Sequence, residues 1–296
     1  MLIKIKNDRE ESKLKVKYDC IPCILRQSIE AARLVTDDEE VIDEIIRNYS
    51  EMIPEIRESN PTPLVVSQIQ KMIKNKTNNK DPYQKLKEKN IRMAMDIYED
   101  LKDLIENDKD PLKKSLLLSA TGNVIDAGIS VKIKVEESIL NTMEKGFSID
   151  DYQEFKEKLK DSQTFLIIGD NAGEAVLDKL LLRELNKYDI DLTYAVREEP
   201  VLNDITLKES KLIGLDKYAN VISSGCNAPG MLIDQATPEF LEKYTKADIV
   251  LSKGQGNLEG LSEEKRSIFF LLKAKCDLIA EFLEVDLNDL VFKYMD

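Results

Sequence analysis

The chain has 296 residues, of which 42% are hydrophobic and 33% are charged, a composition typical of an ordered globular protein with one large or two modest domains. Its 56 acidic residues exceed its 43 basic ones and give a net charge of -13, which argues against a nucleic-acid partner because binding a duplex needs a positive surface. The sequence has no His, which excludes His-based catalytic triads and imidazole metal ligands, so hydrolytic chemistry must use carboxylates, Lys, Cys or a metal.

The N-terminal segment is rich in Lys and Glu and lacks the apolar core of a signal peptide. No apolar stretch approaches the roughly 20 residues that a membrane-spanning helix needs. We therefore expect a cytoplasmic protein with no membrane partner.

The stretch "YDCIPCILRQSIEAARLV", residues 18–35, predicts an amphipathic helix. Cys20 and Cys23 lie three residues apart near its N-terminus, where the helix dipole favours thiolate. One interpretation is a redox or soft-metal site that Cys226 or Cys276 could complete. The other is a pair of small, partly buried residues where this helix meets the rest of the fold. A single CxxC without His is a weak zinc signal, because four ligands are usual.

Helical periodicity continues around residues 38–57, 64–76 and 82–106. The next segment, "PLKKSLLLSATGNVIDAGI", begins as a helix and breaks at a Gly-Asn pair, near Asn123 and Asp126. A glycine-containing C-cap explains this break as well as a functional role does.

The segment "FSIDDYQEFKEKLKDSQ" is also expected to be helical. We predict a helical region over residues 1–160 and an α/β domain over 161–296, which could pack as one compact body.

From Gln163 onward, apolar strands alternate with helices. The predicted strands are FLIIG, DLTYAV, NVISS, DIVLS and IFFLLKA, and the helices between them include the leucine-rich segment after Gly173. In that helix we expect Asp178 to turn away from the apolar face. Alternation of this kind indicates a parallel sheet with right-handed crossovers, so the fold class is α/β.

Polar and glycine-rich loops follow the successive strands. The candidate site residues in them are Asp170, Asn171, Glu174, Arg197, Asp204, Lys253 and Asn257. The carboxyl ends of parallel strands meet at one edge of a sheet, where ligands bind, so a shared site is a better explanation than independent turns. The alternative for Asp170 is that it only caps the following helix.

The residue types suggest a chemistry. Asp170, Asn171 and Asp204 offer hard oxygen donors that suit Mg²⁺ or Mn²⁺. Lys253 supplies a cation in a loop whose glycines let backbone N–H groups approach an anion. Together they suggest a phosphate held between a metal and Lys253. No GxxxxGK[ST] sequence is present, which disfavours a nucleotide-hydrolysing motor.

The motifs "GDNAGE", "VREEPVLNDIT", "SSGCNAPG" and "SKGQGNLEGL", preceded by "GNVID" and "YDCIPCILRQ", resemble those of the metal-dependent damage-control phosphatases. The resemblance extends from about residue 18 to about residue 280 and is strongest to the archaeal branch with an N-terminal CxxC. It implies a helical N-terminal region packed on a Rossmann-like α/β/α sandwich with a mainly parallel sheet. It also implies metal-dependent hydrolysis of small phosphomonoesters, such as sugar phosphates or damaged phosphometabolites.

The resemblance assigns roles to individual residues. It implies that Asp170, Asn171 and Asp204 hold a divalent ion (Mg, Mn, Co or Ni) and that Lys253 contacts phosphate. Asp170, Asp204 and Lys253 are the expected catalytic residues, and either aspartate could orient the attacking water. The expected substrate-binding residues are Asn123, Asp126, Glu174, Arg197, Lys253 and Asn257.

Two alternatives remain open at this point. An S-adenosylmethionine-dependent carboxyl methyltransferase is one, although no glycine fingerprint supports it and the oxygen ligands would have no obvious use in it. The other is a metabolite-binding or redox-sensing protein in which Cys20 and Cys23 are the working part. Tight binding without turnover, or activity that follows the thiol state, would favour the latter.

Overall fold

The computed structural model describes residues 14–56, 61–122 and 132–296. A seven-stranded sheet of order β1-β7-β6-β5-β2-β3-β4 forms its centre. The strands are β1 (Phe147–Asp150), β2 (Thr164–Ile168), β3 (Asp191–Val196), β4 (Asn220–Ser223), β5 (Ile249–Lys253), β6 (Ile268–Lys273) and β7 (Leu290–Met295). Neighbouring strands are parallel except for the antiparallel pair β6 and β7. The α/β fold with a mainly parallel sheet is thereby confirmed.

Helices precede the sheet in the sequence and then alternate with its strands. They are α1 (Cys20–Arg33), α2 (Glu39–Ile56), α3 (Thr62–Thr77), α4 (Gln84–Glu106), α5 (Pro111–Thr121), α6 (Lys132–Glu144), α7 (Tyr152–Asp161), α8 (Glu174–Leu185), α9 (Leu207–Leu212), α10 (Pro238–Lys246), α11 (Gln255–Leu261) and α12 (Asp277–Leu283). Among the described residues, no helix is long and apolar enough to cross a membrane.

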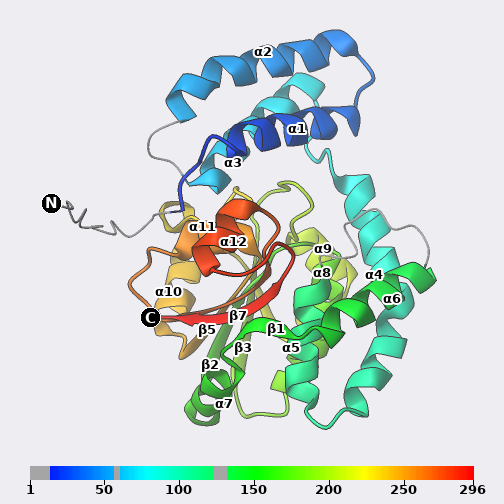
Figure 1. The fold of residues 1–296 in the computed structure, drawn as a ribbon, viewed down its shortest axis with the longest axis vertical. Helices are drawn as coiled ribbons and strands as arrows, with labels where there is room; N and C mark the ends of the chain where they lie inside the picture. Colours follow the sequence, from blue (N-terminus) through cyan, green and yellow to red (C-terminus); the bar gives the residue numbers. More distant parts are fainter. Residues whose placement is uncertain (1–13, 57–60, 123–131) are drawn as a thin grey trace, which may run out of the picture.

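Both faces of the sheet are buried, which explains the continuous apolar runs of its strands. Along β2, Phe165 and Ile167 face a core shared with α4, α5, α7 and α8, whereas Leu166 and Ile168 face a second core shared with α10, α11 and α12. Figure 1 shows α10 and α11 on one side of the strands and α4, α5 and α8 on the other. The alternation follows from the two-residue period of a strand.

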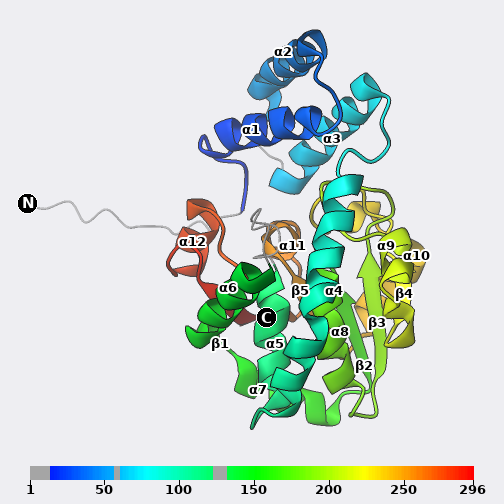
Figure 2. The ribbon, with the colours of Figure 1, turned by 90° about the vertical axis from the view of Figure 1, so that its right-hand side faces the viewer.

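Helices α1, α2 and α3 have a hydrophobic core of their own, which includes Ile24, Tyr49 and Ile69. Figures 1 and 2 show them as a separate layer at one end of the molecule, above α11 and α12. They therefore lie over the edge formed by the carboxyl ends of the strands, rather than against either face of the sheet.

Two strands, β1 and β7, were not predicted from the sequence. β1 lies within residues 147–163, where a helix was expected, and the region of residues 1–160 therefore contributes a strand to the sheet. β1 has four residues, alternates between partly buried and exposed positions, and pairs only with β7 at the sheet edge. Such a short strand is stabilised by pairing with a segment distant in the sequence. That segment is β7, which was not predicted either.

Candidate functional site

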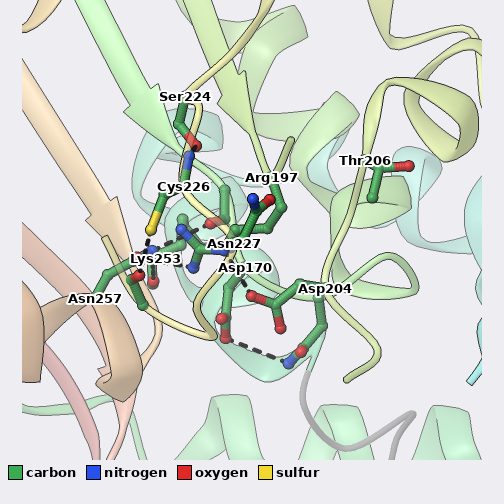
Figure 3. A network of polar contacts seen from close by, with 12 residues as sticks. Asp170, Arg197, Asp204, Thr206, Ser224, Cys226, Asn227, Lys253 and Asn257 are labelled. Atoms are coloured by element: carbon green, nitrogen blue, oxygen red, sulfur yellow. Dashed lines mark hydrogen bonds and ion pairs between the residues drawn. The ribbon is translucent and has the colours of Figure 1, made fainter. Parts of the chain in front are cut away.

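The loops after β2 and β3 are joined by main-chain contacts. The Ile205 N–H donates to the Asp170 carbonyl (2.8 Å), and Asn171 and Asp204 form an isolated antiparallel bridge. These contacts bring together the three oxygen donors expected to bind a metal. Figure 3 shows the Asp170 and Asp204 carboxylates next to each other. The N-cap of α8 is Gly173, so Asp170 does not cap that helix.

The strand β5 pairs with β2 and ends beside Asp170. Gly254, the residue after β5, has φ +79°, and a Cβ atom there would lie 2.1 Å from Asp170 Oδ2. A side chain at this position would therefore displace the carboxylate. The sequence suggested that this glycine admits an anion to the backbone, but in the structure it makes room for Asp170.

A cavity of about 310 Å³ opens above these loops. Asp170, Asn171 and Asp204 line it from the sheet edge, and Gln27 and Glu30 line it from α1. The remaining wall is formed by Thr62, Pro63, Val66, Tyr83, Leu202, Asn203, Pro229, Gln255, Gly256, Glu259 and Lys275. The helical layer α1–α3 thus closes the side opposite the carboxylates.

Arg197 and Asn257 lie behind Asp204. The buried Arg197 donates from Nε to Asp204 Oδ2 (2.7 Å) and from Nη2 to Asn257 Oδ1 (2.9 Å). Asn257 Nδ2 in turn donates to the carbonyl of Lys253 (2.6 Å). Neither residue is among the described residues that line the cavity. In this arrangement both side chains help to orient Asp204, and the expectation that they bind substrate stays a prediction.

Lys253 also points away from the cavity. Its fully buried ammonium contacts the Glu174 carboxylate, Asp178 Oδ1 (2.6 Å) and the Ser119 carbonyl (3.2 Å). All three ammonium protons therefore have protein acceptors. Strand alternation is the reason, because it places Lys253 on the same face of β5 as Leu251, toward the core that contains α5 and α8. Neither Lys253 nor Glu174 is among the described residues that line the cavity, and the expected contacts of Lys253 with phosphate and of Glu174 with substrate stay predictions.

Asp178, which was expected to turn away from the apolar face of α8, belongs to the buried polar network around Lys253. It accepts from Ser119 Oγ (2.6 Å) and Tyr194 Oη (2.6 Å), and every residue of α8 except Arg183 is buried. The prediction was wrong because α8 packs between the sheet and two other helices. The i, i+4 spacing of Glu174 and Asp178, which puts both carboxylates on one helix face, was the available signal.

Electrostatics in the cavity favour a cation. Burial raises the pKa of Asp204 to about 7, against the opposing effect of Arg197, and the charge of Asp170 adds to the increase. Burial also raises the pKa of Asp170, against the positive charge of Lys275. Two carboxylates in one buried place repel each other when both are ionised, and a positive ion relieves that repulsion.

Lys275 was missed in the sequence. It follows β6 and lines the cavity with Asp170 and Asp204, whose pKa values its charge lowers. The signal that could have identified it is the rule applied to the other loops, that polar residues after a parallel strand gather at the same edge of the sheet.

The remaining sequence candidates lie apart from the three oxygen donors. Cys20 and Cys23 line a second cavity, of about 340 Å³, together with Cys276. Among the described residues, no three His, Cys, Asp or Glu side chains already stand together as a metal-binding group. Asn123 and Asp126 lie outside the residues that the structure describes.

Residues 16–291 match the family model described as the damage-control phosphatase ARMT1-like domain. An uncharacterised protein of Methanocaldococcus jannaschii is 35% identical over 93% of this chain and 94% of its own length. The protein named damage-control phosphatase of Archaeoglobus fulgidus is 29% identical, covering 96% of this chain and all of the relative. The crystal structure of a DUF89 family protein of Pyrococcus horikoshii superposes with a TM-score of 0.86 at 31% identity, covering 94% of this chain and 98% of the other.

Proposed function

This chain belongs to the family defined by the damage-control phosphatase ARMT1-like domain, and we propose that it is a metal-dependent phosphatase acting on small, damaged phosphorylated metabolites. Two archaeal relatives carry the name damage-control phosphatase. The observation that carries the proposal is the grouping of Asp170, Asn171 and Asp204 on the wall of one cavity.

The donor set fits a hard divalent cation. Two carboxylates and one amide supply oxygen ligands of the kind that Mg²⁺ and Mn²⁺ prefer, and Co²⁺ or Ni²⁺ could replace them. Asn171 and Asp204 are buried, and the negative charges of Asp170 and Asp204 repel each other. A cation bound between them would relieve this repulsion. When bound there, a divalent ion would neutralise phosphoryl oxygens and lower the pKa of a bound water.

The chain's own residues would position the reacting groups. Arg197 fixes Oδ2 of Asp204, so the orientation of that carboxylate is set before substrate arrives. Lys275 brings positive charge to the cavity, where a phosphate could be held against it. Phosphoryl transfer depends mostly on such positioning and charge stabilisation, because the protein has little covalent chemistry to perform.

The opposite wall favours a small, hydroxyl-bearing substrate. The cavity volume of about 310 Å³ is near the lower end of the roughly 300–1,000 Å³ common for ligand sites. Gln27, Glu30 and Tyr83 line it with amide, carboxylate and hydroxyl groups. Such groups hydrogen-bond to the hydroxyls of a sugar or polyol phosphate.

The proposal is tested by phosphate release from p-nitrophenyl phosphate and a panel of pentose and hexose phosphates. Activity should disappear in EDTA and return with Mg²⁺, Mn²⁺, Co²⁺ or Ni²⁺. Release that is unaffected by EDTA would contradict the metal dependence, and no release with any metal or substrate would contradict the phosphatase assignment.

A variant locates the activity in this cavity. Asp170→Asn should lower the rate at least about 100-fold, since it removes a charged ligand, while the circular dichroism spectrum stays unchanged. Asp234→Asn, the same substitution at an exposed position, is the control and should retain full activity. Equal activity in the two variants would place the reaction elsewhere.

A further inference from the structure

Three of the four cysteines lie around one cavity, and they come from opposite ends of the sequence. Cys20 and Cys23 are in the first turns of α1, and Cys276 directly precedes α12. Both ribbon views place α12 below the beginning of α1 (Figures 1 and 2). No disulfide joins the cysteines. The structure therefore selects Cys276, and not Cys226, as the partner that the sequence left open.

A buried carboxylate lies in the same cavity wall. Glu259 of α11 is 9% exposed, and its Oε2 atom is buried without a hydrogen-bond partner. An unpaired buried carboxylate oxygen is costly, so it indicates a missing ligand. Glu259 lies close enough to Cys20 and Cys276 for its charge to oppose ionisation of both thiols.

We propose that this thiol cavity binds one soft divalent cation, of which Zn²⁺ is the type, through the Sγ atoms of Cys20, Cys23 and Cys276 and a carboxylate oxygen of Glu259. Three thiolates and one carboxylate form a four-coordinate set suited to zinc and unlike the all-oxygen set at Asp170. Binding releases the protons of the ligands to solvent, and no electron transfer takes place.

The side chains must move inward to coordinate an ion, because no three acidic or thiol side chains of the described residues yet converge on one point. Each cysteine has a single side-chain torsion between its backbone and its sulfur, so a rotamer change is enough to redirect it. The sulfurs line a cavity of about 340 Å³, which leaves space for that rotation.

The charge around this cavity favours a cation. The carboxylate of Glu259 lies in the same cavity wall as Cys20, Cys23 and Cys276. A bound cation would neutralise the negative charges of the three thiolates and of this carboxylate together.

The proposed ion would support the wall of the phosphatase cavity. Gln27, Thr62, Gln255, Glu259 and Lys275 line both cavities. Coordination would tie α1, which carries Gln27, to the loop that carries Lys275. This role is structural and does not depend on the proposed hydrolysis.

Cobalt provides the direct test. The full chain is reduced, freed of metal with EDTA and titrated with Co²⁺, with the thiolate-to-cobalt charge-transfer absorption as the readout. One equivalent should develop this band in the wild type and in Cys226→Ser. The control is apt because Cys226 is buried elsewhere, with its Sγ donating to the Gly230 carbonyl (3.2 Å). Zn²⁺ should bleach the band.

The ligand variants should behave differently from a variant of the oxygen site. Cys20→Ser and Cys276→Ser should lose most of the band, and Glu259→Gln should weaken cobalt binding at least about 10-fold. Asp204→Asn should keep the band while losing phosphatase activity, which separates this inference from the proposed function. Metal-free variants with unchanged circular dichroism exclude misfolding as the cause.

Two results would overturn the inference. One is the absence of a charge-transfer band in the reduced wild type. The other is a band of equal intensity in the wild type, Cys20→Ser and Cys276→Ser. A disulfide from Cys276 to Cys20 or Cys23, mapped by mass spectrometry together with no band after reduction, would assign the cavity to thiol oxidation instead.

Discussion

The position of Asp170 depends on the absence of a side chain at Gly254. Gly254 combines φ +79° with ψ 156°, a region almost restricted to glycine, and its Cα faces the Asp170 carboxylate. Strain and collision therefore coincide at this position. The position of the Asp170 carboxylate thus rests on a neighbouring residue that has no side chain.

Gly254→Ala should lower phosphatase activity about 100-fold, because a displacement of about 1 Å in a positioned group has that effect. It should also cost about 1–3 kcal/mol of unfolding free energy. Gly146→Ala is the control, since Gly146 has φ +70° but nothing within 4 Å of an added Cβ. It should lose some stability and no activity. Equal losses of activity in the two variants would contradict the explanation.

At the scale of the elements, one buried polar network joins α5, α8, β3 and β5 beneath the site. Lys253 lies at its centre, between the carboxylates of Glu174 and Asp178. Burial raises the pKa of Glu174 to about 8, against the charge of Lys253. Removal of the lysine would leave two carboxylates without their shared cation in the core.

Lys253→Met should destabilise the protein by about 3–5 kcal/mol, as expected when one partner of a buried ion pair is lost. Lys179→Met is the control. Lys179, in α8, is buried like Lys253 but donates to the Ile213 carbonyl rather than to a carboxylate. Its cost should be about 1–2 kcal/mol. Urea unfolding measures both, and a similar cost for the two would reject the role of the network.

A second element, α1, should determine which substrates are hydrolysed. Gln27 and Glu30 reach the cavity from its far wall. The variants Gln27→Ala and Glu30→Gln should raise KM for sugar phosphates about 10-fold, the effect of losing a hydrogen bond of about 1.4 kcal/mol. KM for p-nitrophenyl phosphate, which has no such hydroxyls, should stay constant. Arg33→Ala, exposed on the same helix, should change neither value. A uniform rise for both substrates would indicate a general role.

At the scale of the whole molecule, the cavity lined by Asp170 and Asp204 lies between the sheet edge and a helical layer with its own core. Glu259 is placed at this junction, where α11 meets α3, and burial raises its pKa to about 7, against a smaller effect of Thr62. A carboxyl whose pKa is higher in the folded state holds its proton there more tightly than in the unfolded chain. Its contribution to stability is therefore complete below its ordinary pKa and is lost as the pH rises through the folded value.

The metal-free protein should thus lose unfolding free energy between about pH 4.5 and about pH 7, by about 3 kcal/mol from Glu259 alone. Burial of Asp204 acts with the same sign. Urea unfolding across this range in EDTA measures the effect. Glu259→Gln should flatten the profile, and Glu239→Gln, at an exposed position, should not. A profile that is steeper in Glu259→Gln than in the wild type would contradict the assignment.

Local pattern in the sequence was enough for most of the helices, though not for α6, α11 and α12, and for five of the strands and the grouping of Asp170, Asn171 and Asp204. Apolar periodicity reports which element forms, and polar loops after successive parallel strands must meet at one edge. These features depend on residues near one another in the chain. The resemblance of the loop motifs to the damage-control phosphatases agreed with the family to which the chain belongs.

Tertiary structure decided the rest, because it depends on what packs against each element. The side of β5 that Lys253 occupies, the burial of Asp178 and the pairing of β1 with β7 are set by neighbours distant in sequence. The same is true of Cys276, which approaches Cys20 only after the chain has crossed the sheet and returned. A sequence records the chemistry of each side chain, whereas its partners and its burial are properties of the packed molecule.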